Sequence, residues 1–141
     1  MQHMPQVEAA RCGERFDYRP VFAALAPRMR AADLTVVNLE TTLTRHGRYT
    51  GYPLFRSPVA LADALRDAGV DVAVLANNHC CDGGAEGIRT TVAELDRCGI
   101  LHTGVFADSA DYKKNNPLYL NRCGMRLALV NYTYGTNGMP V

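Results

Sequence analysis

Two short valine-rich runs, each leading into a helical pattern, constrain the fold of this chain more than any other feature. Residues 33–40 read DLTVVNLE, and residues 70–78 read VDVAVLANN. Nearly continuous apolar runs of this length are typical of strands buried on both faces of a parallel sheet. A helical pattern at residues 57–69 separates the two runs, and another at residues 83–99 leads to a third apolar run at 100–105. This alternation predicts an α/β fold built from right-handed βαβ units.

Turn and cap residues set the expected limits of the helices. Ser57 and Pro58 are residue types that open helices, as N-cap and first helical residue, and Gly69 suits a helix end. An earlier helix is predicted at residues 19–32. Within it, Pro27 is expected to kink or end the helix, because proline has no amide hydrogen to donate.

The remaining segments complete the predicted domain. Residues 41–55 are polar and contain glycine, so they are expected to form a loop. Residues 116–134 have the pattern of two strands joined at NRCG, with MRLALVNY at 125–132 as a further buried core strand. A length of 141 residues is that of one ordinary domain. We therefore expect residues 1–141 to form a single α/β domain with a parallel sheet and a hairpin.

Composition excludes several classes of protein. The chain is 48% hydrophobic and 21% charged, as in soluble globular proteins. A net charge of +1 without a basic run argues against nucleic acid as a partner, although a local site can still bind a small anion. Neither a signal peptide nor an apolar run of about 20 residues is recognisable.

The cysteines do not have the pattern of a covalent framework. They are odd in number and have no CxxC spacing, which argues against disulfides and a structural zinc site. Most are expected to be small buried hydrophobic residues. The five are Cys12, Cys80, Cys81, Cys98 and Cys123.

Polar side chains follow the two valine-rich strands where each strand ends. Asn38 and Glu40 close the first, and Asn77, Asn78 and His79 follow the second. Ligands of open α/β sheets bind beyond the carboxyl ends of the strands, so we expect these two clusters to lie side by side if the strands are neighbours. Carboxylate, amide and imidazole groups together suit a divalent zinc, manganese or iron ion.

Four stretches carry a family resemblance: ADLTVVNLETTLT, YTGYPLFRSP, AGVDVAVLANNHCCDGGAEGIRTTVAELDRCGILHTGVF and LVNYTYGTNGMPV. With these motifs, in this order, the chain resembles the bacterial capsule-synthesis CapA (poly-gamma-glutamate biosynthesis) family, a branch of the calcineurin-like metallophosphoesterases. The resemblance implies a metallophosphoesterase-like layered sandwich. It also implies that these residues are part of a larger domain, incomplete at both ends, in a protein of the cell envelope.

The resemblance assigns roles at the metal site. It makes Asn78 a metal ligand, and it places Glu40 and His3 as further ligands. His79 would contact the scissile phosphate or donate a proton to the leaving group, since an imidazole changes charge near neutral pH. Asp82 would orient His79. In the alternative, Asn78 and Asp82 cap a turn and the next helix, and Glu40 pairs with an arginine.

Further side chains are candidates for substrate contacts. Arg56 has a planar fork that suits an anion, although an arginine here is more often surface charge. Asn38 and Asn77 are also candidates for substrate contacts. The alternative is that they only hold the loop and the turn in place through hydrogen bonds. Tyr134 and Asn137 follow the last predicted strand, which should end at the same edge of the sheet.

Two classes of function follow from the resemblance. The first is a metal-dependent hydrolase that acts on a phosphoester. The second is a non-catalytic factor that binds or assembles an anionic capsule polymer with other capsule-synthesis proteins, and fold alone does not decide between them. A glycine-loop nucleotide binder is a weaker third class, because GxGxxG and GxxxxGK[ST] are absent. Exposed sheet edges would also favour self-association.

Overall fold

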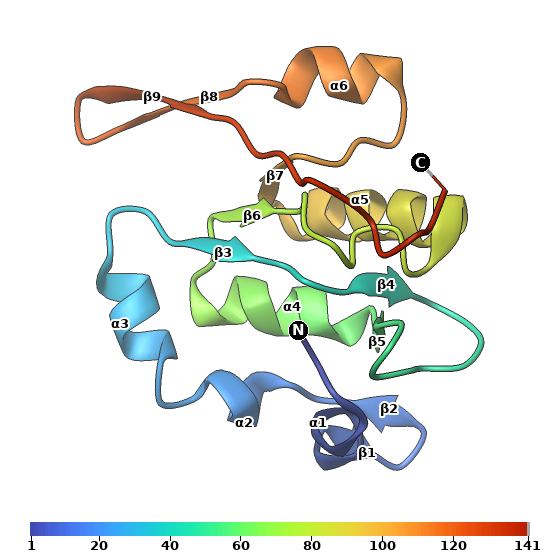
Figure 1. The fold of residues 1–141 in the computed structure, drawn as a ribbon. Helices are drawn as coiled ribbons and strands as arrows, with labels where there is room; N and C mark the ends of the chain where they lie inside the picture. Colours follow the sequence, from blue (N-terminus) through green and yellow to red (C-terminus); the bar gives the residue numbers. More distant parts are fainter. Residues whose placement is uncertain (141) are drawn as a thin grey trace.

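The structure, a computed structural model, describes residues 1–140 (Figure 1). A parallel sheet of three strands forms its centre, with β6 between β3 and β7. Helix α4 connects β3 to β6 after a second strand pair, and α5 connects β6 to β7, so the predicted α/β fold with βαβ units is confirmed. These elements are β3 (Val36–Asn38), α4 (Ala60–Ala68), β6 (Val72–Val74), α5 (Gly84–Cys98) and β7 (Leu101–Thr103).

Helices and strands form layers around one core. In Figure 1, α4 lies below β3 and β4 and above α1 and α2, while the β8–β9 hairpin stands at the top beside α6. Leu61 and Leu65 of α4 and Leu95 of α5 pack with residues of the strand ends in one buried cluster. Burial of each such leucine contributes about 1.5–3 kcal/mol. The core members from the strand ends include Leu39, Leu43, Val70, Leu75 and Ile100.

A second parallel pair occupies the segment that was predicted to be a loop. Strands β4 (Thr42–Thr44) and β5 (Arg56–Pro58) pair within and beyond residues 41–55. Ser57 therefore lies in a strand, and α4 begins at Ala60 after the N-cap Val59, which corrects the predicted helix start. The Ser57 hydroxyl is 2.9 Å from the Thr41 hydroxyl. Sheet pairing and this buried contact outweigh the capping preference of serine.

The predicted helix at residues 19–32 is two helices. They are α2 (Arg19–Phe22) and α3 (Ala26–Ala31), separated by a turn. Pro27 lies in the first turn of α3, so it opens this helix instead of ending a longer one. The first turn tolerates proline because its amide hydrogens have no partner within the helix. Besides β4 and β5, the elements that the sequence did not predict are α1 (Met4–Ala9), β1 (Arg11–Cys12), β2 (Arg15–Phe16) and α6 (Ser109–Asn115).

Helix α4 ends as predicted, at a glycine with a left-handed backbone. Gly69 has a φ of 99°, and its amide donates to the carbonyl groups of the last turn. A Cβ atom there would lie 2.9 Å from the backbone nitrogen of Arg30. Both the conformation and the close approach of α3 therefore require glycine.

Two strands are more exposed than their apolar sequences predicted. The hairpin of β8 (Leu118–Arg122) and β9 (Met125–Leu129) turns at the predicted residues. However, within residues 1–140 β9 pairs only with β8, and Met125 is 59% exposed, so residues 125–132 are not a buried core strand. The same correction applies to β3, an edge strand whose Val36 is 41% exposed. No helix described within residues 1–140 has the length and apolar character of a membrane span.

The cysteines divide into exposed and protected groups, which predicts their reactivity. Cys12 and Cys123 are exposed, whereas Cys80 and Cys81 are buried and Cys98 is half-buried. The expectation that most would be buried is therefore wrong. Burial raises the pKa of the Cys81 and Cys98 thiols to about 11, and a hydrogen bond to Asp33 also raises the pKa of Cys123.

We expect a maleimide at neutral pH to label Cys12 first and Cys123 next, since the thiolate is the reactive form. Cys81 should react only in denaturant. Mass spectrometry of labelled peptides measures each rate. Labelling of Cys81 as fast as Cys12 in the folded protein would contradict the described packing.

Candidate active site

The turn after β6 joins the ends of the two neighbouring strands. Asn38 and Val74 are partners in the parallel register of β3 and β6. The side-chain nitrogen of Asn77, Nδ2, donates to Asn38 Oδ1 and to the Leu39 carbonyl, each over 3.1 Å. The predicted clusters therefore do lie side by side. Asn77 Oδ1 accepts a hydrogen bond of 3.0 Å from the His79 amide. The buried Asn77 carboxamide therefore shapes the turn that presents the following imidazole.

His79 and Asp82 form a buried pair within this turn. His79 Nδ1 lies 2.8 Å from Asp82 Oδ2, and the two residues are 6% and 0% exposed. Asp82 Oδ2 also accepts a hydrogen bond from the Phe55 amide. A carboxylate at Nδ1 favours the proton on that nitrogen, which leaves Nε2 of the neutral ring as the acceptor. Within residues 1–140, Nε2 has no hydrogen-bond partner.

Phe55 holds both members of this pair, and the sequence did not indicate it. Its ring meets the His79 ring edge to face, with centroids 4.5 Å apart. The His3 ring packs against Phe55 in the same way at 5.1 Å. His3 also caps α1, since its backbone amide donates to the Gln6 side chain over 2.6 Å. His3 and His79 therefore both pack against the same ring, that of Phe55.

The segment after β9 returns to the same edge of the sheet. Asn131 binds the segment just after β6, because its Oδ1 accepts a hydrogen bond of 2.6 Å from the Ala76 backbone amide. Further along, Asn137 Nδ2 lies 3.4 Å from His79 Nδ1, and Asn137 Oδ1 lies 3.4 Å from the side-chain nitrogen of Asn78, Nδ2. The structure therefore joins Asn78 and Asn137 beside the imidazole. Tyr134 of the same segment is fully exposed.

Gly104 leaves room for the segment after β9 to pack at this edge of the sheet, and its replacement should lower the stability of the fold. Its φ is 97°, and a Cβ atom would lie 2.2 Å from Asn131 Oδ1. We expect Gly104→Ala to displace Asn131, to lower the free energy of unfolding by about 1–3 kcal/mol, and to speed hydrogen exchange at the Ala76 amide. Urea unfolding and amide exchange measure both effects.

A matched control separates backbone strain from the clash. Gly124 has a φ of 76°, and no atom lies within 4 Å of its added Cβ. Gly124→Ala should therefore show only the strain of a left-handed alanine. An equal loss of stability in the two variants would show that Asn131 does not hold the segment.

Arg56 and Glu40 have different surroundings. Arg56 Nε donates to the Asp82 carbonyl over 3.0 Å, so the guanidinium is anchored beside the His79 turn. Glu40 is half-buried after β3, and no arginine within the described chain forms an ion pair with it. The alternative role of Glu40 as an arginine partner has no counterpart in residues 1–140.

The described residues do not by themselves surround a metal ion. Within residues 1–140, no group of three or more histidine, cysteine, aspartate or glutamate side chains is placed to hold one. A metal at this turn would need amide oxygens, such as that of Asn78, or donors from outside these residues. Within residues 1–140, the pair of His79 and Asp82 is the candidate for a reactive group at this turn.

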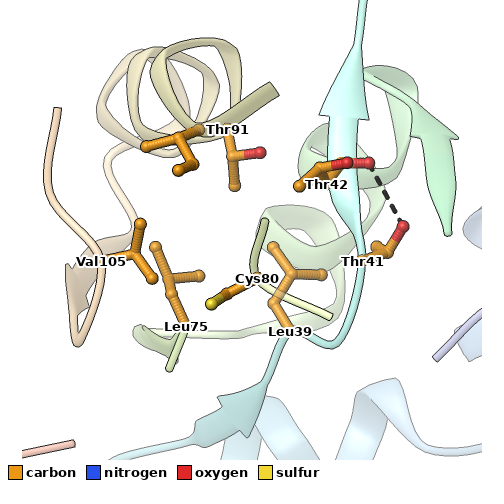
Figure 2. Close-up of a pocket in the computed structure, with 8 residues that line it drawn as sticks. Leu39, Thr41, Thr42, Leu75, Cys80, Thr91 and Val105 are labelled. Carbon is orange, nitrogen blue, oxygen red and sulfur yellow. Dashed lines mark hydrogen bonds between the residues drawn. The ribbon is translucent and has the colours of Figure 1, made fainter. Parts of the chain in front are cut away.

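The cysteines of the turn belong to its packing. Figure 2 shows Cys80 directed between Leu39 and Leu75, toward a cavity of about 10 Å³. That volume holds about one water molecule. Cys81 has a pKa of about 11 because it is buried, so it is present as the thiol and not as a nucleophile.

Sequence comparison places this site in a known family. Residues 1–140 match the model described as "Bacterial capsule synthesis protein PGA_cap". The chain belongs to this family. The resemblance to capsule-synthesis proteins is thereby confirmed over nearly the whole chain.

Curated relatives of this PGA_cap chain are longer proteins. It is 39% identical over 83 residues to "Probable polyglutamine synthesis accessory protein MT0602" of Mycobacterium tuberculosis (strain CDC 1551 / Oshkosh), a match that covers 55% of this chain and 21% of that protein. Identity to "Capsule biosynthesis protein CapA" of Bacillus anthracis is 34% over 70 residues, or 50% of this chain and 16% of that protein. "Uncharacterized protein y4sH" of Sinorhizobium fredii (strain NBRC 101917 / NGR234) is 35% identical over 95 residues, which is 62% of this chain and 21% of that protein. The matches thus span about a fifth of each relative.

Proposed function

We propose that this chain acts in the synthesis of a capsule or poly-gamma-glutamate polymer, and that His79 transfers a proton in a phosphoester hydrolysis that accompanies it. The observation that carries the proposal is the buried pair of His79 and Asp82, 2.8 Å apart. Catalytic bases are held in this way by a third group that sets the tautomer and the ring orientation. A buried carboxylate is otherwise a costly residue in a turn.

The geometry defines what His79 can do. In the neutral ring Nε2 accepts a proton from a water molecule or hydroxyl group. After it has been protonated, the same nitrogen can donate that proton to a departing oxygen, while Asp82 stabilises the imidazolium. Proton transfer by a positioned side chain contributes about 10²–10⁴-fold to a rate.

Neighbouring residues suit an anionic substrate. Asn78 and Asn137 offer donors beside the imidazole, and Arg56 is anchored on the Asp82 carbonyl, close to it in the chain. Asn38, Asn77 and Tyr134 are further candidates for substrate contacts. A divalent manganese, iron or zinc ion, with His3, Glu40 and Asn78 among its ligands, belongs to the same proposal for the whole protein. So do the cell envelope as its location and other capsule-synthesis proteins as partners.

A second candidate function is binding of the anionic polymer without turnover. The donors that the site offers to an anion, Asn78 and Asn137 beside His79, fit this role as well. In this case His79 would donate a hydrogen bond to the polymer and would not shuttle a proton. Self-association of the chain through exposed strands such as β3 is compatible with either function.

One experiment separates the two candidates. The protein as encoded is purified without chelators, its metal content is measured by elemental analysis, and phosphoester hydrolysis is assayed with p-nitrophenyl phosphate and its diester. We expect stoichiometric metal that falls in Asn78→Ala, together with turnover. Absence of metal and of turnover in the wild-type protein would overturn the hydrolase proposal and leave the binding role.

A further inference from the structure

A hollow of about 130 Å³ lies where the loop after β4 meets the start of α5. It has a polar lining that includes two arginines, one histidine and two threonines. These residues come from three parts of the chain that the fold brings together. They include Thr44, His46, Arg48, Arg56, Glu86 and Thr90.

Both arginines have unused donors. Neither Arg48 nor Arg56 has a carboxylate within 4.0 Å in the described chain, whereas Arg45 and Arg97 both pair with the buried Glu94. Arg56 is held by its Nε atom on the Asp82 carbonyl, and no hydrogen bond engages its terminal nitrogens within residues 1–140. A guanidinium that is anchored by one nitrogen loses less freedom when the other two bind an anion.

Glycines keep this hollow close to the sheet. A Cβ atom on Gly83 would lie 2.7 Å from the Thr42 hydroxyl, and one on Gly87 would lie 3.1 Å from Thr42 Cβ. Larger residues would therefore push α5 away from β4. The glycines that follow Asp82 in the sequence thus allow the helix to approach the strand that supports the arginines.

Glu86 provides an internal check on the charge of the hollow. It is exposed, and it makes no ion pair with either arginine within 4.0 Å. Its carboxylate therefore opposes an anion without neutralising a particular guanidinium. Removal of this charge should strengthen the binding of an anion, which is the opposite of the effect of removing an arginine.

We propose that this hollow binds an oxyanion, the carboxylate or phosphate group of a ligand, between Arg48 and Arg56. The site is distinct from His79 Nε2 but is joined to it through Asp82, whose side chain orients His79 and whose carbonyl anchors Arg56. The inference deepens the proposed function, because it assigns the anionic substrate a second point of attachment. Its test measures binding alone, so it stands or falls separately from catalysis.

The test is to titrate the protein as encoded with an anion and to measure binding by calorimetry and by NMR of the arginine side chains. The probes are inorganic phosphate and a glutamate tripeptide, which distinguish phosphate from carboxylate recognition. We expect at least one probe to bind, and Arg56→Gln and Arg48→Gln each to weaken it about tenfold or more. Glu86→Gln should tighten binding of the same probe about twofold to fivefold.

The control variant carries the same change of charge elsewhere. Arg28 lies on α3, is exposed and forms no ion pair within the described residues; Figure 1 shows α3 and β5 at opposite sides of the molecule. Arg28→Gln should leave binding unchanged. The exposed Arg48 keeps the test decisive if Arg56→Gln fails to fold. Failure of both probes to bind at millimolar concentration, or equal effects of Arg28→Gln and Arg48→Gln, would overturn the proposal.

Discussion

Replacement of His79 by glutamine lowers the turnover of a phosphoester by about 10²–10⁴-fold, if the imidazole transfers a proton as proposed. Glutamine keeps much of the volume and polarity of the ring, but it cannot take up or release a proton near neutral pH. The Michaelis constant should change far less than the turnover number, because the loss falls on the transition state. Steady-state kinetics over a range of pH measures both.

Asp82→Asn is the companion variant for this experiment. It preserves the shape of the side chain that contacts His79 Nδ1 at 2.8 Å. It removes the negative charge that would stabilise the imidazolium. We expect a loss of turnover together with a changed pH profile, which a purely structural role would not produce. Arg28→Gln serves as the control. Retention of turnover within twofold in His79→Gln would contradict the assignment of His79 as the proton carrier.

Replacement of Phe55 by alanine lowers the free energy of unfolding by about 3–5 kcal/mol. The ring is 1% exposed and packs edge to face against both His3 and His79. Its removal leaves a cavity under the turn that carries His79, and aromatic pairs add about 0.5–1.5 kcal/mol beyond the area that they bury. Equilibrium unfolding in guanidinium chloride measures the loss.

Phe106 offers a matched control for Phe55. Its ring also makes an edge-to-face contact, with Tyr112 at 5.1 Å, but the residue is only half-buried. Phe106→Ala should therefore cost clearly less than Phe55→Ala and leave turnover unchanged. Equal losses of stability in the two variants would mean that Phe55 does not organise the site.

The course of the central sheet could be predicted because periodicity and cap residues agreed there. The valine-rich runs and Gly69 gave the βαβ order, and the polar residues after each strand gave the edge at which Asn38 and Asn77 meet. Burial could not be predicted in the same way. Val36 and Met125 lie in apolar runs, but their exposure depends on which elements cover β3 and β9, and local sequence does not contain that information.

Competing local signals explain the errors in the helix limits. Ser57 and Pro58 are good residues for a helix start, yet the pairing of β5 with β4 uses them in a strand. Similarly, Pro27 ends a helix in one context and opens it in another. Tertiary contacts decide between such alternatives, because each local preference amounts to about 1 kcal/mol.

The candidate site could be predicted only where its residues are close in sequence. His79 and Asp82 are three positions apart, and their pairing was one of the two roles expected for Asp82, beside that of a helix N-cap. Phe55 makes contacts through its ring and its amide from 24 residues before His79, and no local pattern marks it. The hollow with Arg48 and Arg56 likewise depends on the loop after β4 folding over α5.

The most direct test of a role for the His79 and Asp82 pair in polymer synthesis is the amount of capsule polymer made by cells. A strain that lacks this gene is complemented with the wild type, with His79→Gln and with Arg28→Gln, and the protein level is measured in each. We expect His79→Gln to lower the polymer yield about tenfold or more at an unchanged protein level, while Arg28→Gln restores it. Full restoration by His79→Gln would contradict the central claim that this buried pair carries the function.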